Sequence, residues 1–254
     1  MTDAVSTSVT NGVMTITMNR PEAKNAVNLA MAQGIAAAID ELDSNDDIRV
    51  GILTGANQTF CSGMDLKAFV SGEVPYIAGR GFGGLTEAPP SKPLIAAIEG
   101  YALAGGCELA MVCDLIVAAD NAKFGIPEVK RGLAAAAGGL MRFPRQLPYR
   151  LAMELALTGD FLEADRALSL GFINGVVEAG TALQAAEQLA EKIAANGPLA
   201  VKLSKAVVRD SQDWATSDMF AKQQDILNPV FISEDAIEGA TAFAEKRAPV
   251  WKGR

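Results

Sequence analysis

Histidine is absent from the 254 residues of the chain. Without imidazole the protein has no Ser-His or Cys-His catalytic pair, and most kinds of zinc site are excluded as well. The three cysteines, Cys61, Cys107 and Cys113, lie among small and apolar residues and lack the paired spacing of metal ligands. We therefore expect reduced, buried cysteines and no metal site, which leaves carboxylates, lysine, tyrosine or cysteine for any acid–base chemistry.

A surplus of positive charge is also missing. The chain has 22 Lys and Arg against 30 Asp and Glu, a formal net charge of -8 at pH 7, and no cluster of basic residues. Nucleic acids and anionic membranes both bind concentrated positive charge, so neither is expected as the main partner. The first residues, MTDAVSTSVTNG, lack a basic region followed by an apolar one, so we expect no signal or transit peptide and a cytoplasmic protein.

Short strand and helix patterns alternate through most of the chain. The alternation of apolar and polar residues around Asn11-Gly12 predicts a β-hairpin. Helical spacing at 28–42 and 105–113 is interleaved with short strand patterns at 48–54, 94–98, 115–118 and 172–177. Strands that alternate with helices indicate an α/β fold with much of its sheet parallel.

The C-terminal part is different, because from Thr181 onward the pattern is almost entirely helical. Four helices are predicted between Gly-Pro, Asn-Pro and polar breaks, at 182–195, 199–209, 217–227 and 234–246. We predict a core over residues 1–195 and a helical C-terminal region over 196–254. The segment 71–93, with five glycines and four prolines, predicts a mobile surface loop, and loops of that length are often lids.

One glutamate, Glu108, stands in the apolar stretch 100–120. Glu108, Asp114 and a glycine pair make membrane insertion of this stretch costly, so a buried helix and strand fit better. The turn-forming Ala104-Gly105-Gly106 predicts a helix start whose unpaired N–H groups can bind an anion or a developing oxyanion. In the first helical turn the dipole favours an ionised Glu108 and burial opposes it, which suits a catalytic carboxylate. The alternative is a glutamate that only caps its helix.

Two other segments have the same ingredients. FCSGMDLK at 60–67 follows the predicted strand 48–54 and leads into a short helix, which gives a second helix start with free N–H groups. Two such donors that face each other form an oxyanion hole. Glu128 follows the string FGIP and precedes the Gly/Ala-rich run 132–139. Each piece has a structural interpretation, but two glutamates and two glycine-bearing helix starts together indicate a site.

With these motifs the sequence resembles the enoyl-CoA hydratase family, also called the crotonase superfamily. The matching segments run in the family's order over nearly the whole chain: NRPEAKNA at 19–26, FCSGMDLK at 60–67, GYALAGGCELA at 100–110, PE at 127–128 and FAEKR at 243–247. The resemblance implies an α/β fold, the crotonase (ClpP-like) spiral of repeated ββα units, with a helical C-terminal trimerisation region. It also implies a homotrimer or a dimer of trimers.

By this resemblance, the backbone N–H groups of Met64 and Gly105 hold the thioester oxygen of an acyl-CoA substrate. Only the main chain is needed there, so Met64, where the family often has alanine, is expected to narrow the pocket without abolishing the hole. Other contacts to the CoA ester are implied at Lys24, Ala26, Met64, Asp65, Leu66, Lys67 and Gly105. Phe243 and Lys246 match C-terminal positions that reach a CoA bound in the family's oligomers. The structural alternatives are a solvated Lys67, a core Phe243 and a surface Lys246.

Glu108 and Glu128 match the two catalytic glutamates of the hydratases. Hydration of a conjugated enoyl thioester needs a base to take a proton from water as its oxygen attacks C3, and an acid to protonate C2. An oxyanion-hole donor typically lowers such a barrier by roughly 3 to 4 kcal/mol. We assign Glu108 as the base and Glu128 as the acid, with the roles exchanged in dehydration. The reaction moves water and protons only, so no metal, flavin or nicotinamide cofactor is expected, and CoA enters as part of the substrate.

The match weakens after Glu128, where the family usually has a proline and then Gly-x-Gly-Gly. Ala135 replaces that proline and Ala136 replaces a glycine. Two interpretations are open: a changed acyl-pocket wall or water position, or alanines that only strengthen a helix start.

The leading hypothesis is a trans-2-enoyl-CoA hydratase, reversible as a 3-hydroxyacyl-CoA dehydratase, in fatty-acid or related acyl-CoA breakdown. Within the same superfamily, a 3-enoyl-CoA to 2-enoyl-CoA isomerase needs mainly one base and can use the same site. A non-catalytic acyl-CoA-binding protein is the alternative from a different class. The length, branching and ring content of the acyl group do not follow from the sequence.

Overall fold

The structure is a computed structural model that describes residues 3–254, and a six-stranded sheet in the order β1-β2-β3-β6-β8-β11 forms its centre. The predicted hairpin is confirmed, because β1 (Val5–Thr10) and β2 (Val13–Met18) are antiparallel and joined by Asn11-Gly12, both with positive φ. The remaining neighbours are parallel: β3 (Val50–Gly55), β6 (Leu94–Ile98), β8 (Leu115–Ala119) and β11 (Gly175–Val177). The prediction of a largely parallel α/β sheet is therefore confirmed.

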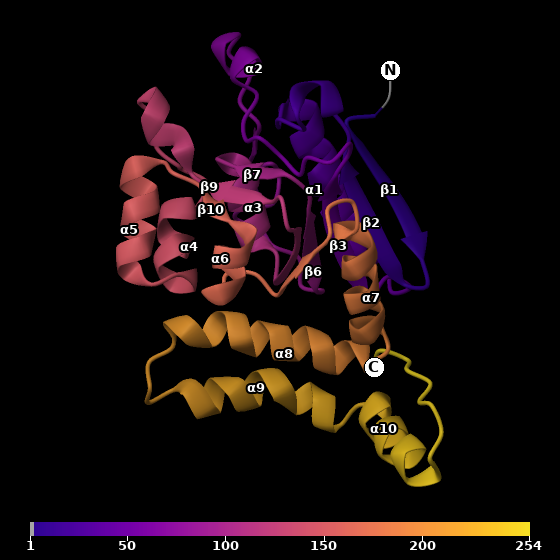
Figure 1. The fold of residues 1–254 in the computed structure, drawn as a ribbon. Coiled ribbons are helices and arrows are strands. Elements are labelled where there is room, and N and C mark those ends of the chain that lie inside the picture. The colour runs from indigo at the N-terminus through magenta and orange to yellow at the C-terminus, as the bar shows by residue number, and fades with distance from the viewer. Residues whose placement is uncertain (1–2) are drawn as a thin grey trace.

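Helices cover both faces of this sheet (Figure 1). Helix α7 (Ala182–Ala194) packs on one face, where Ala186, Ala190 and Ala194 recur at helical spacing and let the helix approach the β-branched side chains of the strands. The other face packs against α1 (Leu29–Ser44), α3 (Gly105–Val112) and a second sheet. That second sheet has the order β10 (Leu162–Glu163), β9 (Lys123–Gly125) and β7 (Tyr101–Leu103), and β7 leads directly into α3.

The segment 71–93 differs from the prediction of a surface loop. It contains a small antiparallel pair, β4 (Tyr76–Ile77) and β5 (Gly81–Phe82), and residues 81–86 are all buried. Phe82 and Leu85 anchor this part in the main core. Gly84, with φ +68, turns the chain close under α1, where a Cβ would lie 2.8 Å from the Cβ of Ala36. The glycines therefore serve close packing, and the prediction is wrong for 81–86.

The C-terminal part is helical, as predicted. Helices α8 (Pro198–Asp210), α9 (Met219–Phe231) and α10 (Glu234–Glu245) lie at one end of the core (Figure 1). Two boundaries were predicted wrongly. Helix α9 continues through Pro229, which stands in its last turn. Strand β11 begins only at Gly175, because the side chain of Asn174 accepts the N–H of Ile116 in place of a backbone carbonyl.

The remaining helices are α2 (Leu66–Val70), α4 (Gly139–Gln146), α5 (Tyr149–Thr158) and α6 (Ala164–Ser169). Short 3-10 helices occur at Pro21–Ala23, Pro127–Arg131 and Ser211–Asp213. Cys61, Cys107 and Cys113 are reduced and buried, as predicted. Within residues 3–254, no helix combines the length and apolarity needed to cross a membrane.

Candidate active site

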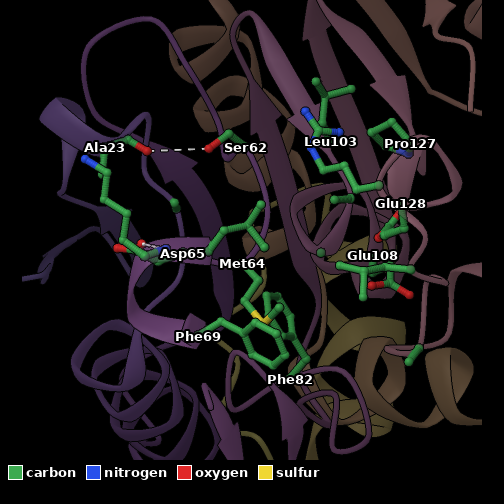
Figure 2. Close-up of a pocket in the computed structure, with 18 of the residues that line it drawn as sticks. Ala23, Ser62, Met64, Asp65, Phe69, Phe82, Leu103, Glu108, Pro127 and Glu128 are labelled. Atoms are coloured by element: carbon green, nitrogen blue, oxygen red, sulfur yellow. Dashed lines mark hydrogen bonds between the residues drawn. The ribbon is translucent and has the colours of Figure 1, made fainter. Parts of the chain in front are cut away.

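A cavity of about 890 Å³ opens between the segments that the sequence singled out. Eight of the predicted site residues line it: Ala26, Met64, Asp65, Leu66, Lys67, Gly105, Glu108 and Glu128. In Figure 2, Met64 lies beside Phe82 on one side of the cavity. Glu108 and Glu128 are neighbours on the other side. Both glutamates and both proposed donors therefore belong to one site.

The two proposed oxyanion-hole donors, the N–H groups of Met64 and Gly105, come from chain segments that are in direct contact. Cys61 forms an isolated parallel bridge with Ala102, with its N–H on the Tyr101 carbonyl at 2.8 Å. Two residues on, Gly63 packs so tightly that a Cβ there would lie 2.7 Å from the Ala104 Cβ and 3.3 Å from the Gly105 nitrogen. Glycine at 63 thus permits the approach that brings Met64 close to Gly105.

The N–H groups of Met64 and Gly105 have no acceptor among the protein groups of residues 3–254. Gly105 begins α3, where the first N–H groups of a helix have no intrahelical partner. The preceding residue, Ala104, has φ +52, a left-handed conformation that costs free energy for a residue with a Cβ. The sharp turn between β7 and α3 directs the chain so that Gly105 lines the cavity.

Glu108 is held firmly inside the protein, with 2 % of its surface exposed. Its Oε1 accepts the N–H groups of Ala137 and Gly139, both at 2.8 Å. Burial raises the pKa of Glu108 to about 7, with a further contribution from the Glu128 charge; the two N–H donors and Arg142 oppose the rise. A carboxyl group with this pKa can both take and give a proton near neutral pH. The simpler interpretation, a glutamate that caps its helix, does not account for these contacts.

Glu128 approaches from the short helix Pro127–Arg131. Its Oε2 is buried and has no hydrogen-bond partner among the protein groups of the described chain. Burial raises its pKa, against the opposing effects of its own backbone N–H and of Arg131. Burial therefore favours the protonated form of Glu128, which is the form that an acid requires.

Residues 132–138 of this run form a loop, and α4 begins only at Gly139. The interpretation that its alanines strengthen a helix start is therefore wrong. Ala134 and Ala136 line the cavity, whereas Ala135 and Ala137 are buried behind it. The alanines thus form part of the cavity wall beside Glu128.

Asp65 has a structural task of its own. Its carboxylate caps α2 (Leu66–Val70) by accepting the N–H groups of Lys67 and Ala68, and it pairs with Arg20 at 2.9 Å. The prediction of free N–H groups at this helix start is wrong, because the Asp65 carboxylate accepts hydrogen bonds from the N–H groups of Lys67 and Ala68. Met64 lies before the cap, in an extended segment that bridges Val27, and its N–H stays available.

Three predicted residues lie outside the cavity of this chain. Lys24 directly follows Ala23, which lines the cavity, and its Nζ lies 5.5 Å from the centre of the Tyr101 ring. Phe243 lies in the last turn of α10 and Lys246 directly follows this helix. In Figure 1, α10 lies at the opposite end of the molecule from α2, which contributes residues to the cavity. Phe243 is 87 % exposed, so the interpretation of a core aromatic is wrong.

Several cavity residues were not predicted from the sequence. The aromatic side chains of Phe69, Tyr76, Phe82 and Phe161 line the cavity together with Leu103. Tyr76 and Phe82 form an edge-to-face pair with ring centroids 5.7 Å apart. Tyr76 and Phe82 belong to the segment 71–93, whose glycines and prolines predict a loop, often a lid, but do not mark either aromatic residue as part of a cavity wall.

Comparison with known proteins shows the family of the chain. The family model described as enoyl-CoA hydratase/isomerase matches residues 8–254. Enoyl-CoA hydratase EchA19 of Mycobacterium tuberculosis is 44% identical, with 94% of this chain and 92% of that protein covered. Carnitinyl-CoA dehydratase of Proteus mirabilis is 39% identical over 100% of both chains.

Solved structures show the same relationship. The crystal structure of enoyl-CoA hydratase EchA1 from Mycobacterium marinum has a TM-score of 0.98 and 57% sequence identity, and covers 99% of this chain and 100% of its own. Carnitinyl-CoA hydratase from Mycobacterium avium has a TM-score of 0.80 and 42% identity over 100% of both chains. The expectation of a crotonase fold is confirmed. The chain belongs to the enoyl-CoA hydratase/isomerase family.

Proposed function

We propose that the protein is an enoyl-CoA hydratase, which adds water reversibly to a trans-2-enoyl-CoA to give a 3-hydroxyacyl-CoA. The observation that carries the proposal is the meeting of Glu108 and Glu128 in one cavity with the N–H groups of Met64 and Gly105. An isomerase needs mainly one proton-transferring group, whereas hydration uses a base and an acid together. A place in fatty-acid or related acyl-CoA breakdown follows from this reaction class.

In the proposed reaction the two N–H groups bind the thioester oxygen. As the C3–O bond forms, electron density moves from the C2–C3 double bond toward that oxygen, and the donors stabilise the resulting enolate. The sharp turn at Ala104 and the tight contact at Gly63 hold both donors before the substrate arrives, so little reorganisation is needed during the reaction.

Glu108 is the proposed base and Glu128 the proposed acid. Glu108 keeps its Oε1 on two backbone donors, so its second oxygen is the one directed to the attacking water. Glu128 has a buried oxygen without a protein partner, and this oxygen is suited to deliver a proton to C2. Dehydration reverses both transfers. The reaction needs no cofactor beyond the CoA of the substrate itself.

CoA is proposed to bind along the side of the cavity formed by residues 20–26 and 62–69. Arg20 ties these two segments together, because its guanidinium donates to the Ala26 carbonyl at 2.6 Å and to Asp65 at 2.9 Å. Lys67 is exposed at the cavity edge and supplies a positive charge for a phosphate. Lys24 directly follows Ala23, a cavity residue, and is proposed to add a second positive charge there.

The first experiment follows the loss of the conjugated thioester absorbance when the protein is mixed with short and long trans-2-enoyl-CoA esters. A second assay follows the appearance of this absorbance when the protein is mixed with carnitinyl-CoA, which reports dehydration. We expect hydration that falls by at least about 100-fold in both Glu108→Gln and Glu128→Gln. Tight CoA-ester binding without hydration would overturn the proposal. Turnover of a 3-enoyl-CoA alone would then favour the isomerase, and no turnover at all would favour the non-catalytic acyl-CoA-binding protein.

We also propose a homotrimer or a dimer of trimers. Large apolar side chains on and around α9 and α10 are strongly exposed in the single chain: Phe220 81%, Phe231 76%, Ile232 85%, Ile237 71% and Phe243 87%. Such surfaces are typical of protein interfaces, and assembly is the proposed way for Phe243 and Lys246 to reach a neighbouring CoA. Sedimentation of the wild type as a 26.5 kDa monomer would contradict the proposal, and Phe220→Asp is expected to weaken assembly.

A further inference from the structure

Arg142, on α4, lies behind the cavity and holds two separate segments of the chain. Its Nη1 donates to the carbonyl of Ala137 at 3.1 Å, and its Nη2 donates to the carbonyl of Thr86 at 2.7 Å. The guanidinium therefore bridges the loop 132–138 and the buried segment 81–86. Arg142 is not among the residues that line the cavity.

Each of the bridged segments supports one half of the candidate site. The loop and the first residue of α4 provide the N–H groups of Ala137 and Gly139 that hold Oε1 of Glu108. The buried segment carries Phe82, whose ring lies against Gly105, where a Cβ would be 2.5 Å from the Phe82 Cε1. One side chain thus connects the supports of the carboxylate and of an oxyanion-hole donor.

The loop is shaped to receive this guanidinium. Gly138 has φ +103, and a Cβ at that position would overlap Nη1 of Arg142. Gly139 has no Cβ to hinder its approach to Glu108, where such an atom would lie 3.0 Å from Oε1. The glycine pair 138–139 therefore admits Arg142 on one side and Glu108 on the other.

We propose that Arg142 is a positioning residue, which orients Glu108 relative to Gly105 by fixing the Ala137 and Thr86 carbonyls. The inference rests on the proposed hydratase function for its kinetic consequences, whereas its structural consequence can be measured without turnover. Arginine suits this task because its planar fork reaches two acceptors at once, which the single ammonium group of lysine does not.

Charged and titratable groups face Glu108 from several elements. Glu128 stands on the short helix 127–131, Tyr76 on β4, Cys107 on α3 and Arg142 on α4. Burial, with the glutamate charges added, raises the pKa of Tyr76 and of Cys107, so both stay neutral near pH 7. Burial and Glu128 raise the pKa of Glu108, and the Arg142 charge lowers it.

The test compares Arg142→Gln and Arg142→Lys with Arg145→Gln. Arg145 is a matched control, because it lies on the same helix but pairs with exposed Asp213 at 3.0 Å. We expect both Arg142 variants to lose at least about tenfold in kcat, with KM within about twofold of wild type. The acid limb of kcat/KM is expected to move to higher pH in Arg142→Gln and less in Arg142→Lys, which keeps the charge. Arg145→Gln is expected to behave as wild type.

Amide hydrogen exchange gives a readout that does not depend on turnover. Faster exchange confined to peptides from 132–139 and 81–86 in both Arg142 variants supports the proposal, even for a wild type that hydrates no enoyl-CoA. Unchanged exchange there, or wild-type kcat in Arg142→Lys and Arg142→Gln, overturns it. A loss of kcat with faster exchange throughout the chain also overturns it, because that result indicates a general structural role.

Discussion

Phe82 lies against Gly105 so closely that this position has no room for a side chain. A Cβ at residue 105 would be 2.5 Å from the Cε1 of the Phe82 ring and 3.2 Å from its Cε2. Gly105 does not have a positive φ, so glycine is required here by the neighbouring ring and not by the backbone conformation. The contact with the Phe82 ring fixes the position of Gly105, the first residue of α3, and of its backbone N–H group.

Gly105→Ala is therefore expected to lower kcat/KM by about 100-fold, the typical cost of losing one oxyanion-hole donor. The added methyl group must displace either the ring or the first turn of α3. A second change, Phe82→Leu, removes the ring atoms that collide with the methyl group, and the double variant is expected to regain at least about tenfold. Steady-state kinetics with a short trans-2-enoyl-CoA measures both effects. A double variant as inactive as Gly105→Ala would argue against the ring as the cause.

The pH profile of the wild type is expected to show an acid limb near pH 7. Glu108 must be ionised to act as the base, and its pKa is raised from the ordinary 4.5 to about 7, chiefly by burial. Protonation therefore removes activity as the pH falls through about 7. Measurement of kcat/KM between about pH 5 and pH 9 tests this, because the free enzyme's pKa governs that quantity. An acid limb near 4.5 would show that Glu108 is not the titrating base.

Met64 is expected to limit the size of the acyl group. In Figure 2 its side chain reaches toward Phe82 and Phe69 at one wall of the cavity. Met64→Ala leaves the backbone N–H in place and removes three side-chain heavy atoms, so short substrates are expected to keep kcat within about threefold. The ratio of kcat/KM for a longer or branched enoyl-CoA to that for a four-carbon one is expected to rise by at least about tenfold. An unchanged ratio would place the acyl group elsewhere.

Two kinds of site feature could be predicted from the sequence: a turn with a glycine signal, and a charged residue in an apolar run. The turn at Ala104–Gly106 has a local glycine signal, and Glu108 stands out because a carboxylate is rare in an apolar run. The alternating pattern of the hairpin and the helical spacing after Thr181 are also local, so the corresponding elements were predicted correctly.

What could not be predicted depends on contacts between segments far apart in the sequence. Phe82 meets Gly105 only after the segment 81–86 has packed under α1, and glycine-rich composition does not distinguish a buried turn from a mobile loop. The ion pair of Asp65 with Arg20 is a similar case, because the two residues lie 45 positions apart in the sequence. The contacts of Arg142 with Ala137 and Thr86 likewise have no local signature.

Glu108 is expected to reduce the stability of the protein above neutral pH. Its pKa is raised in the folded state, to about 7 from 4.5, so the folded protein binds this proton more tightly than the unfolded chain does. The associated stabilisation is complete below about pH 4.5 and is lost as the pH rises through about 7. A shift of this size corresponds to about 3 kcal/mol between the two limits. Ionised Glu108, which the proposed reaction requires, thus lowers the stability of the folded protein.

Glu108→Gln removes this titration while retaining a side-chain oxygen that can accept from Ala137 and Gly139. The variant is expected to melt several degrees above wild type near pH 8.5, and the difference is expected to shrink toward zero near pH 5. Glu22→Gln is the matched control, since that side chain is 72% exposed at the cavity edge, and it is expected to change neither value. Thermal unfolding at both pH values measures the difference. A constant gap between wild type and Glu108→Gln across this range would show that the Glu108 carboxyl has the same pKa in the folded and unfolded chain, and would contradict the raised pKa on which the expected acid limb depends.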